Sequence, residues 1–125
     1  LNALVAALRD ADFHVRQAAA DALGNVGGAR AAPPLIAALR DGHARVRQSA
    51  ASALGNLEAA EAAAHLVPLL GDADANVREA AAYAVGHTGG PPQVSALSAA
   101  LDDADEHVRM AVASALGAIG RGRTP

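Results

Sequence analysis

The sequence has no cysteine and no tryptophan, and it contains one phenylalanine, one tyrosine and one methionine among 125 residues. Without cysteine, disulfides, thiolate metal sites and thiol nucleophiles are excluded. Apolar residues still make up 52% of the chain, and alanine supplies most of them. A core of Ala, Leu and Val suits closely packed helices, whereas a β-sandwich core needs β-branched and aromatic residues. The predicted fold class is therefore all-α.

Lysine is also absent, so that Arg supplies all the Lys/Arg positive charge, and the formal net charge is −3. A net-acidic chain without a basic run is poorly suited to nucleic acid. Residues 80–101 carry no charge, but Gly89-Gly90-Pro91-Pro92 interrupts them, so no continuous helix could cross a bilayer there. Asp10 lies within the first residues, where a secretory signal would be apolar. We predict a cytoplasmic protein with neither a nucleic-acid nor a membrane partner.

An internal repeat organises the whole chain. The dipeptide Val-Arg recurs at a fixed spacing of 31 residues, at Val15-Arg16, Val46-Arg47, Val77-Arg78 and Val108-Arg109. An Asp precedes each Val by five residues, and a Gly follows it by nine, in every copy. A fixed period of this length is typical of solenoid proteins. The chain is therefore predicted to be one domain, 1–125, with repeats at 2–32, 33–63, 64–94 and 95–125.

Each repeat is predicted to hold two helices. In the first repeat these span about 2–9 and about 14–23, and the turn between them ends in Asp12, which is placed to cap the second helix. His43 replaces this acid in the second repeat, so its cap should be weaker. The buried positions of the second helix are predicted to be Val15, Ala18, Ala19, Ala22 and Leu23. Gly24 is expected to end the helix in the left-handed conformation. Such short helices need stacking against neighbouring repeats for stability.

The pattern D-x-D-x-x-V-R-x-A-A-A-x-A-L-G, preceded by P-L-I-x-A-L, resembles the short HEAT-like repeats first described in phycobilisome lyases. The resemblance extends over essentially the whole chain. It implies an α-solenoid, a right-handed superhelix of antiparallel helix pairs, with the first helices on the convex side and the second helices on the concave side. It is specific for fold and weak for function, because such repeats serve as adaptors in unrelated settings.

Four Asp and four Arg recur in register and form the first candidate site. One interpretation is a track of cations that binds an anionic ligand. The other is a structural ladder in which each Arg reaches an Asp at a turn of its own or the adjacent repeat, since desolvated charges are usually paired. We favour the ladder, whose predicted members are Asp10, Arg16, Asp41, Arg47, Asp72, Arg78, Asp103 and Arg109.

A second candidate site is a set of variable positions on the second helices. Most are spaced to form one stripe opposite the buried residues, and the single Phe, Tyr and Met all fall there. Drift of solvated positions would also explain the variation, but aromatic and polarizable residues favour a binding surface. Phe13, Arg45, Tyr83, His87 and Met110 are the predicted principal contacts. We call the full set the second-helix stripe: Phe13, His14, Gln17, Asp21, Arg45, Gln48, Asn76, Glu79, Tyr83, His87, His107, Met110 and Ser114.

Neither a metal nor a cofactor is predicted. The five histidines include no H-x-x-x-H spacing, and His14 and His107 lie three repeats apart. Deoxyhypusine hydroxylases carry His-Glu dipeptides in similar repeats to hold iron, and in this sequence no His is directly followed by Glu. HEAT-like DNA glycosylases need a basic concave face with aromatic residues, whereas the second-helix stripe contains Asp21 and Glu79. A catalytic role is therefore not expected.

The sequence thus predicts a non-catalytic scaffold that binds another protein or peptide through its concave face. The alternative is an accessory domain or subunit of a bilin (tetrapyrrole) lyase. The outermost repeats keep the apolar core pattern, with Leu4 and Leu8 at one end and Leu116 and Ile119 at the other. Solenoid arrays normally end in polar capping repeats. We therefore expect either a longer array around these residues or self-association through the ends.

Overall fold

Helices and turns, without a strand, make up residues 2–122, the part of the chain that the computed structural model describes. Eight α-helices follow one another in four pairs: α1 (Asn2–Ala7) and α2 (Phe13–Val26), α3 (Ala32–Ala38) and α4 (Ala44–Asn56), α5 (Ala63–Leu66) and α6 (Ala75–Thr88), α7 (Val94–Ala100) and α8 (Glu106–Gly120). Short 3₁₀ helices flank them: η1 (Gly28–Ala31), η2 (Ala60–Ala62), η3 (Val67–Gly71) and η4 (Pro91–Gln93). The last residues of the predicted fourth repeat, 123–125, lie outside the described part.

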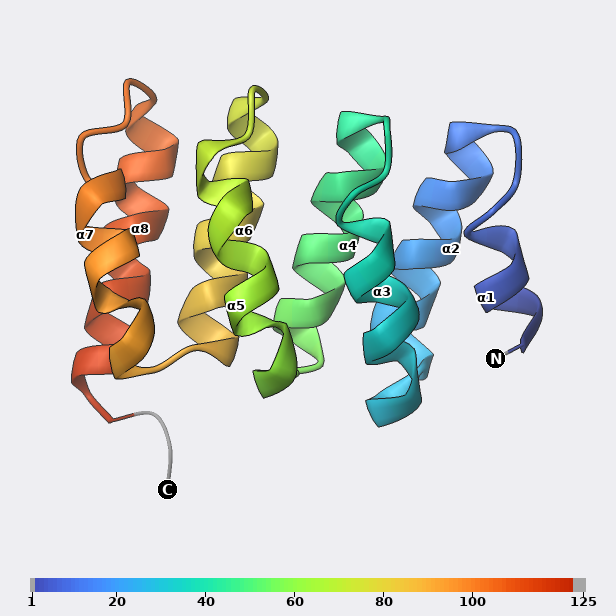
Figure 1. Ribbon diagram of the computed structural model, residues 1–125, viewed down its shortest axis with the longest axis horizontal. Coiled ribbons are helices and arrows are strands. Elements are labelled where there is room, and N and C mark those ends of the chain that lie inside the picture. The colour runs from blue at the N-terminus through green and yellow to red at the C-terminus, as the bar shows by residue number, and fades with distance from the viewer. Residues whose placement is uncertain (1, 123–125) are drawn as a thin grey trace.

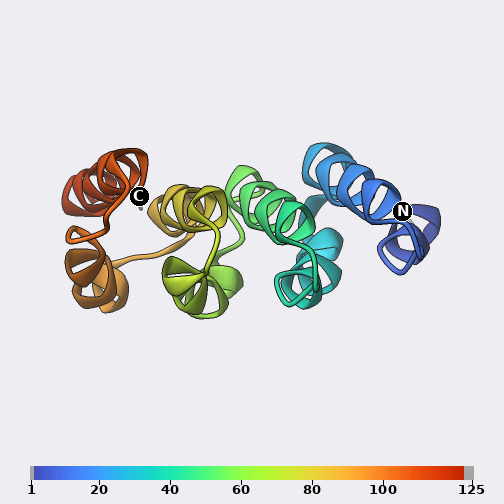
Figure 2. The same cartoon turned by 90° about the horizontal axis from the view of Figure 1, so that it is seen from above.

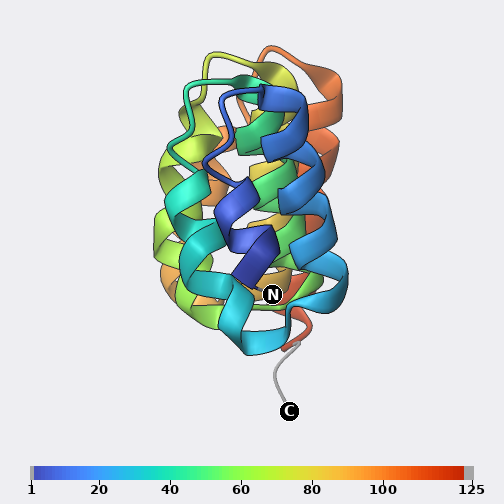
Figure 3. The ribbon, with the colours of Figure 1, turned by 90° about the vertical axis from the view of Figure 1, so that its right-hand side faces the viewer.

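The pairs stack side by side in two layers. The first helices form one layer and the second helices the other, and the pairs follow one another along the long axis (Figure 1). An end-on view shows successive pairs almost superimposed (Figure 3). Seen from above, the row of second helices is shorter than the row of first helices, so the array bends with the second helices on its inner side (Figure 2). The predicted all-α solenoid is confirmed.

Proline shapes two of the first helices. Pro33 and Pro34 lie in the first turn of α3, where a missing N–H breaks no intrahelical hydrogen bond. Pro68 instead falls within the helical segment of the third repeat, and α5 gives way there to the 3₁₀ helix η3. A proline inside a helix removes a backbone donor, which accounts for the irregular first helix of this repeat.

The predicted caps of the second helices are present. The carboxylates of Asp12, Asp74 and Asp105 each accept a hydrogen bond from the backbone N–H two residues ahead, at 2.8, 2.8 and 2.7 Å respectively. His43 caps α4 through its ring nitrogen Nδ1, which accepts from the N–H of Arg45 at 3.1 Å. This longer bond to a neutral acceptor agrees with the expectation of a weaker cap in the second repeat.

The prediction that Gly24 ends the second helix is wrong. Helix α2 continues to Val26, and Gly24 is buried inside it. A Cβ atom at Gly24 would lie 2.7 Å from the Cβ of Ala53 and 2.9 Å from its Cα, on the next second helix. Gly55 and Gly86 face Ala84 and Ala115 in the same way. At these three positions the recurrent glycine therefore serves close helix packing, not chain reversal.

The predicted burial of Val15 is also wrong. Val15 is 39% exposed, and Ala18 on the same helix is exposed too, whereas Val46, Val77 and Val108 are fully buried. In α4, α6 and α8 these positions are covered by the preceding repeat. Helix α2 has no preceding repeat within the described residues, so this side of it faces solvent.

Candidate protein-interaction surface

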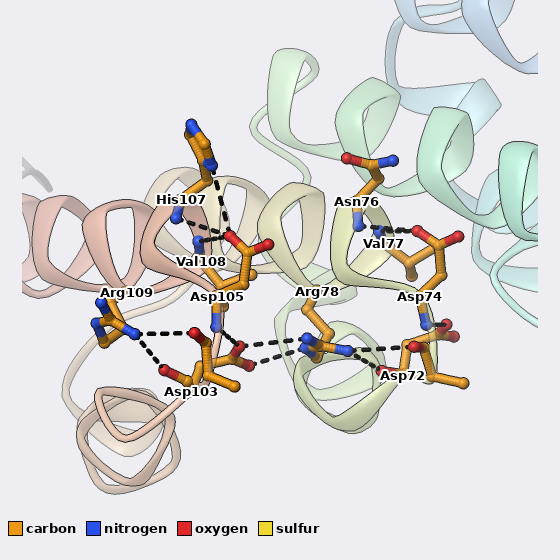
Figure 4. A network of polar contacts seen from close by, with 12 residues as sticks. Asp72, Asp74, Asn76, Val77, Arg78, Asp103, Asp105, His107, Val108 and Arg109 are labelled. Atoms are coloured by element: carbon orange, nitrogen blue, oxygen red, sulfur yellow. Dashed lines mark hydrogen bonds and ion pairs between the residues drawn. The ribbon is translucent and has the colours of Figure 1, made fainter.

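Arginine side chains bridge successive turns along one edge of the array. The Nε of Arg16 donates to Oδ2 of Asp41 at 2.9 Å, and its Nη2 donates to Oδ1 at 3.2 Å. The remaining nitrogen, Nη1, donates to the backbone carbonyl of Asp10 in its own turn at 2.8 Å. The arrangement repeats at Arg47–Asp72 and at Arg78–Asp103, which Figure 4 shows. One guanidinium thus connects its own turn to the turn of the next repeat.

The ladder carboxylates also organise the turn in which they lie. Oδ1 of Asp41, Asp72 and Asp103 accepts the backbone N–H two residues ahead at 2.9, 3.0 and 2.9 Å. Burial raises the pKa of Asp41 and of Asp72, but the hydrogen bonds from Arg and from the backbone outweigh it and hold each pKa below its ordinary value. For Asp103 the hydrogen bond from Arg78 is the largest cause of the lowered pKa. All three groups are therefore held as carboxylates.

Three of the four ladder cations are engaged in ion pairs within the array. Arg16, Arg47 and Arg78 are each bound to a carboxylate and to a backbone carbonyl. Arg109 differs, since within the described residues its guanidinium bonds only to the carbonyls of Asp103 and Ala104, at 2.7 and 3.1 Å (Figure 4). At the opposite end, the carboxylate of Asp10 accepts a backbone N–H but receives no guanidinium from the described part of the chain.

The second-helix stripe lies on α2, α4, α6 and α8, and every residue in it is exposed or half-buried. Met110 is 66% exposed and Tyr83 is 39% exposed. The opposite side of the same helices supplies much of the core, including Leu23, Leu54 and Val85. The stripe residues are therefore available to a partner along the inner side of the bend.

Phe13 departs from the other stripe residues. It is the first residue of α2, at the turn end of the helix, and its ring is half-buried. The ring stacks on that of His43 in the next repeat, with centroids 3.5 Å apart and planes 9° apart, and on that of His14 at 4.0 Å. Much of this ring is thus engaged in a contact between neighbouring repeats. The sequence pattern did not reveal His43 as its partner.

A hollow of about 260 Å³ opens on the stripe between α6 and α8. Tyr83, Gly86 and His87 line it from α6, with Glu79 and Ser114 contributing polar atoms. The small residues that line it from α8 are Ala111, Ala115 and Ala118. The sequence analysis did not identify Ala111 and Ala115, because they look like ordinary core positions, whereas Ala118 falls at a variable position, equivalent to His87.

Tyr83 is held in place at the edge of this hollow. Its hydroxyl donates to Oδ1 of Asn56, on the preceding second helix, at 2.6 Å. Its ring lies against Gly55, where an added Cβ would come within 2.8 Å of the ring atom Cε2. The ring of His87 is 4.5 Å from that of Tyr83, and its Nδ1 lies 3.9 Å from a carboxylate oxygen of Glu58. Tyr83 therefore forms a fixed wall of the hollow.

A larger, polar hollow of about 570 Å³ lies toward the other end of the stripe, over α2, α4 and α6. Its lining includes Gln17, Asp21, Arg45, Gln48 and Asn76. The stripe thus has a polar half near the first two repeats and a half with aromatic and small apolar residues near the last two.

Among residues 2–122, no group of three or more His, Asp or Glu side chains is placed to hold a metal ion. None of the helices in this range has the length and hydropathy that a bilayer crossing requires.

A bent stack of helix pairs, with a ladder of ion pairs along one edge, defines an α-solenoid. The HEAT repeats family matches residues 1–86 and 63–125. The matches together span the chain, which therefore belongs to the HEAT repeat family.

Solved structures with the same fold include both enzymes and engineered proteins. The complex of CpcE and CpcF of phycocyanin lyase from Nostoc sp. PCC7120 has a TM-score of 0.86 and 29% identity, over 96% of this chain and 52% of that chain. Human deoxyhypusine hydroxylase in complex with glycerol has a TM-score of 0.81 and 31% identity, over 96% of this chain and 43% of that chain. An engineered protein has a TM-score of 0.67 and 26% identity, over 95% of this chain and 62% of that chain.

The chain thus spans about half the length of the first two of these proteins. No protein of curated function matches it by sequence.

Proposed function

We propose that this HEAT array is a non-catalytic scaffold that binds another protein through the second-helix stripe. The observation that carries the proposal is the fixed Tyr83 ring beside the hollow between α6 and α8. Immobilised aromatic residues beside a pocket are typical centres of protein–protein interfaces, because little side-chain entropy is lost on binding. The Nostoc lyase structure, which is a complex of CpcE and CpcF, is a further support.

The proposal is tested by capturing partners from the native host with the wild-type chain and with a stripe variant, Arg45→Glu combined with Met110→Glu. Both side chains are exposed, so we expect the variant to fold and to lose the partner. The matched control places two Glu on the layer of first helices, at the exposed Arg40 and His65, and should keep it. If both variants retain the same partner, the stripe is not the binding surface.

A second candidate, favoured by the TM-score of 0.86 to the lyase complex, is an accessory role in attaching a bilin to a protein. In that case the purified chain should change the visible absorption spectrum of an added bilin, and the change should saturate with protein. An unchanged spectrum, together with capture of a partner that carries no tetrapyrrole, would remove this candidate and leave the scaffold.

A further inference from the structure

The hollow between α6 and α8 has the size and lining for a single side chain. Its volume of about 260 Å³ is below the range of about 300–1,000 Å³ that is usual for small-molecule sites. Gly86, Ala115 and Ala118 keep it shallow and apolar, and the rings of Tyr83 and His87 form one wall. An apolar side chain from a partner would lose water on the side that faces the hollow.

The rim of the hollow carries one carboxylate, Glu79. Glu79 is exposed, and its side chain makes no hydrogen bond or ion pair with any described residue. Glu58 does not line the hollow, but its carboxylate lies 3.9 Å from Nδ1 of His87, which does. The only Arg of the stripe, Arg45, belongs to the separate polar hollow. A cationic group beside the apolar side chain would therefore complement this rim.

Building on the proposed function, we propose that this hollow binds a linear peptide segment in which an apolar side chain is followed directly by Arg or Lys. The apolar side chain enters between Tyr83 and Ala118, and the cation pairs with Glu79. The hydrogen bond from Tyr83 to Asn56 fixes the wall before the peptide arrives, so binding does not have to order it. The segment belongs to the protein that the scaffold binds.

The test uses the full chain, labelled with nitrogen-15, and short synthetic peptides in a Gly/Ser framework. The first peptide carries Leu-Arg, the second Leu-Glu and the third Ser-Arg. Titration followed by amide chemical shifts gives both the affinity and the location. We expect the Leu-Arg peptide to shift the amides of Gly86, Ala115 and Ala118. The Leu-Glu peptide should bind about two- to fivefold more weakly, the range set by an exposed ion pair. The Ser-Arg peptide should bind about tenfold or more weakly, because it lacks the buried side chain.

Two variants separate the apolar and the charged contributions. Ala118→Leu fills the hollow and should abolish the shifts, whereas the exposed Ala113→Leu on the same helix should not. Glu79→Gln should remove the difference between the Leu-Arg and Leu-Glu peptides, whereas Asp21→Asn, an exposed carboxylate of the polar hollow, should preserve it.

Shifts confined to another surface, equal affinity for the Leu-Arg and Ser-Arg peptides, or binding unaffected by Ala118→Leu would each overturn the proposal. Equal affinity for the Leu-Arg and Leu-Glu peptides would overturn the assignment of the cation to Glu79. These failures are distinct from failure of the scaffold function. If the host partner is still captured by wild type and lost in the Arg45→Glu, Met110→Glu variant, the scaffold stands and only the hollow is excluded.

Discussion

Arg16 Nε and Asp41 Oδ2 lie 2.9 Å apart, although 25 residues separate them in the sequence. The side chains are only 19% and 13% exposed, so the pair is shielded from water along much of its surface. Because one carboxylate oxygen also accepts a backbone N–H, the ion pair links the stacking of two repeats to the geometry of the turn that starts the next second helix.

Removing a ladder carboxylate should destabilise the array. Asp72→Ala deletes the acceptor of two bonds from Arg47 and of the N–H of Asp74. Leaving partly buried donors without partners should lower the free energy of unfolding by about 1–3 kcal/mol. As a control, Asp102→Ala, at an exposed position next to the ladder residue Asp103, should change the free energy of unfolding by less than about 0.5 kcal/mol. Urea unfolding followed by circular dichroism measures both, and equal effects would contradict the structural role of the ladder.

The ladder also predicts a loss of stability in acid. The pKa values of Asp41, Asp72 and Asp103 are lowered from 3.8 in the folded chain. A carboxyl group with a lowered folded-state pKa contributes stability that is complete above its ordinary pKa and is lost as pH falls through the lowered value. The unfolding midpoint in urea should therefore decrease from about pH 5 toward pH 2. The triple Asp→Asn variant at these positions should be less stable at neutral pH and should show a smaller further loss in acid.

Replacing Gly by Ala at two equivalent positions of the repeat, Gly24 and Gly117, should change stability in opposite directions. At Gly24 the new Cβ would overlap Ala53 on the next helix, and overpacking of this kind lowers stability by about 1–3 kcal/mol. At Gly117 the nearest atom is the end of the flexible Arg121 side chain, at 3.4 Å. There the better helix propensity of Ala should raise stability by about 0.5–1 kcal/mol. Thermal unfolding decides, and the same sign at both positions would contradict the packing role of the glycine.

The sequence pattern predicted the fold well because the repeat specifies it four times. The Val-Arg spacing and the Asp caps fix the helix starts, and the structure places them as expected at Asp12, Asp74 and Asp105. The role of Gly24 was not predictable from one helix alone. In the sequence, a glycine that ends a helix looks the same as a glycine that lets a neighbouring helix pack closely. Only the position of Ala53 on the next helix distinguishes the two.

The candidate site was predicted less completely. Comparison of the four repeats showed that Tyr83 and Met110 occupy variable positions, which predicted that they lie at the surface, and both are exposed. It did not indicate that Tyr83 is bound to Asn56, since that contact depends on how two helices are offset. Ala111 and Ala115, which also line the hollow, were missed, because Ala serves equally as core and as the floor of a pocket.

Because of the contact between Tyr83 and Asn56, two exposed residues of the stripe should differ in how much they contribute to stability. Met110→Ala should leave stability within about 0.5 kcal/mol of wild type, because Met110 is 66% exposed. Tyr83→Phe should lower it by about 0.5–1.5 kcal/mol through loss of the hydrogen bond, and Tyr83→Ala should lower it further because the ring also covers Gly55. Thermal unfolding of the three variants tests this order. Full stability of Tyr83→Ala would show that the ring is not packed.

The two ends of the described stack are complementary. In α2, α4 and α6 the next repeat covers Ala20, Ala51 and Ala82, but the equivalent Ala113 of α8 is exposed. Arg109 has no carboxylate partner in the described residues, and the carboxylate of Asp10, at the other end, receives no guanidinium there. A repeat placed beyond either end would therefore meet the surface that internal repeats already bury.

When these 125 residues are produced on their own, a second copy should therefore stack head to tail, with Arg109 of one copy on Asp10 of the next. Sedimentation should show association that grows with concentration and weakens with salt, because an ion pair contributes to it. Arg109→Asp and Asp10→Arg should each reduce association by placing like charges across the contact, and the double variant should recover it. If each substitution acted only on the stability of the monomer, combining the two would not restore association. Recovery in the double variant therefore shows that the two side chains pair across the contact. Association that is identical in all four proteins would place the contact elsewhere.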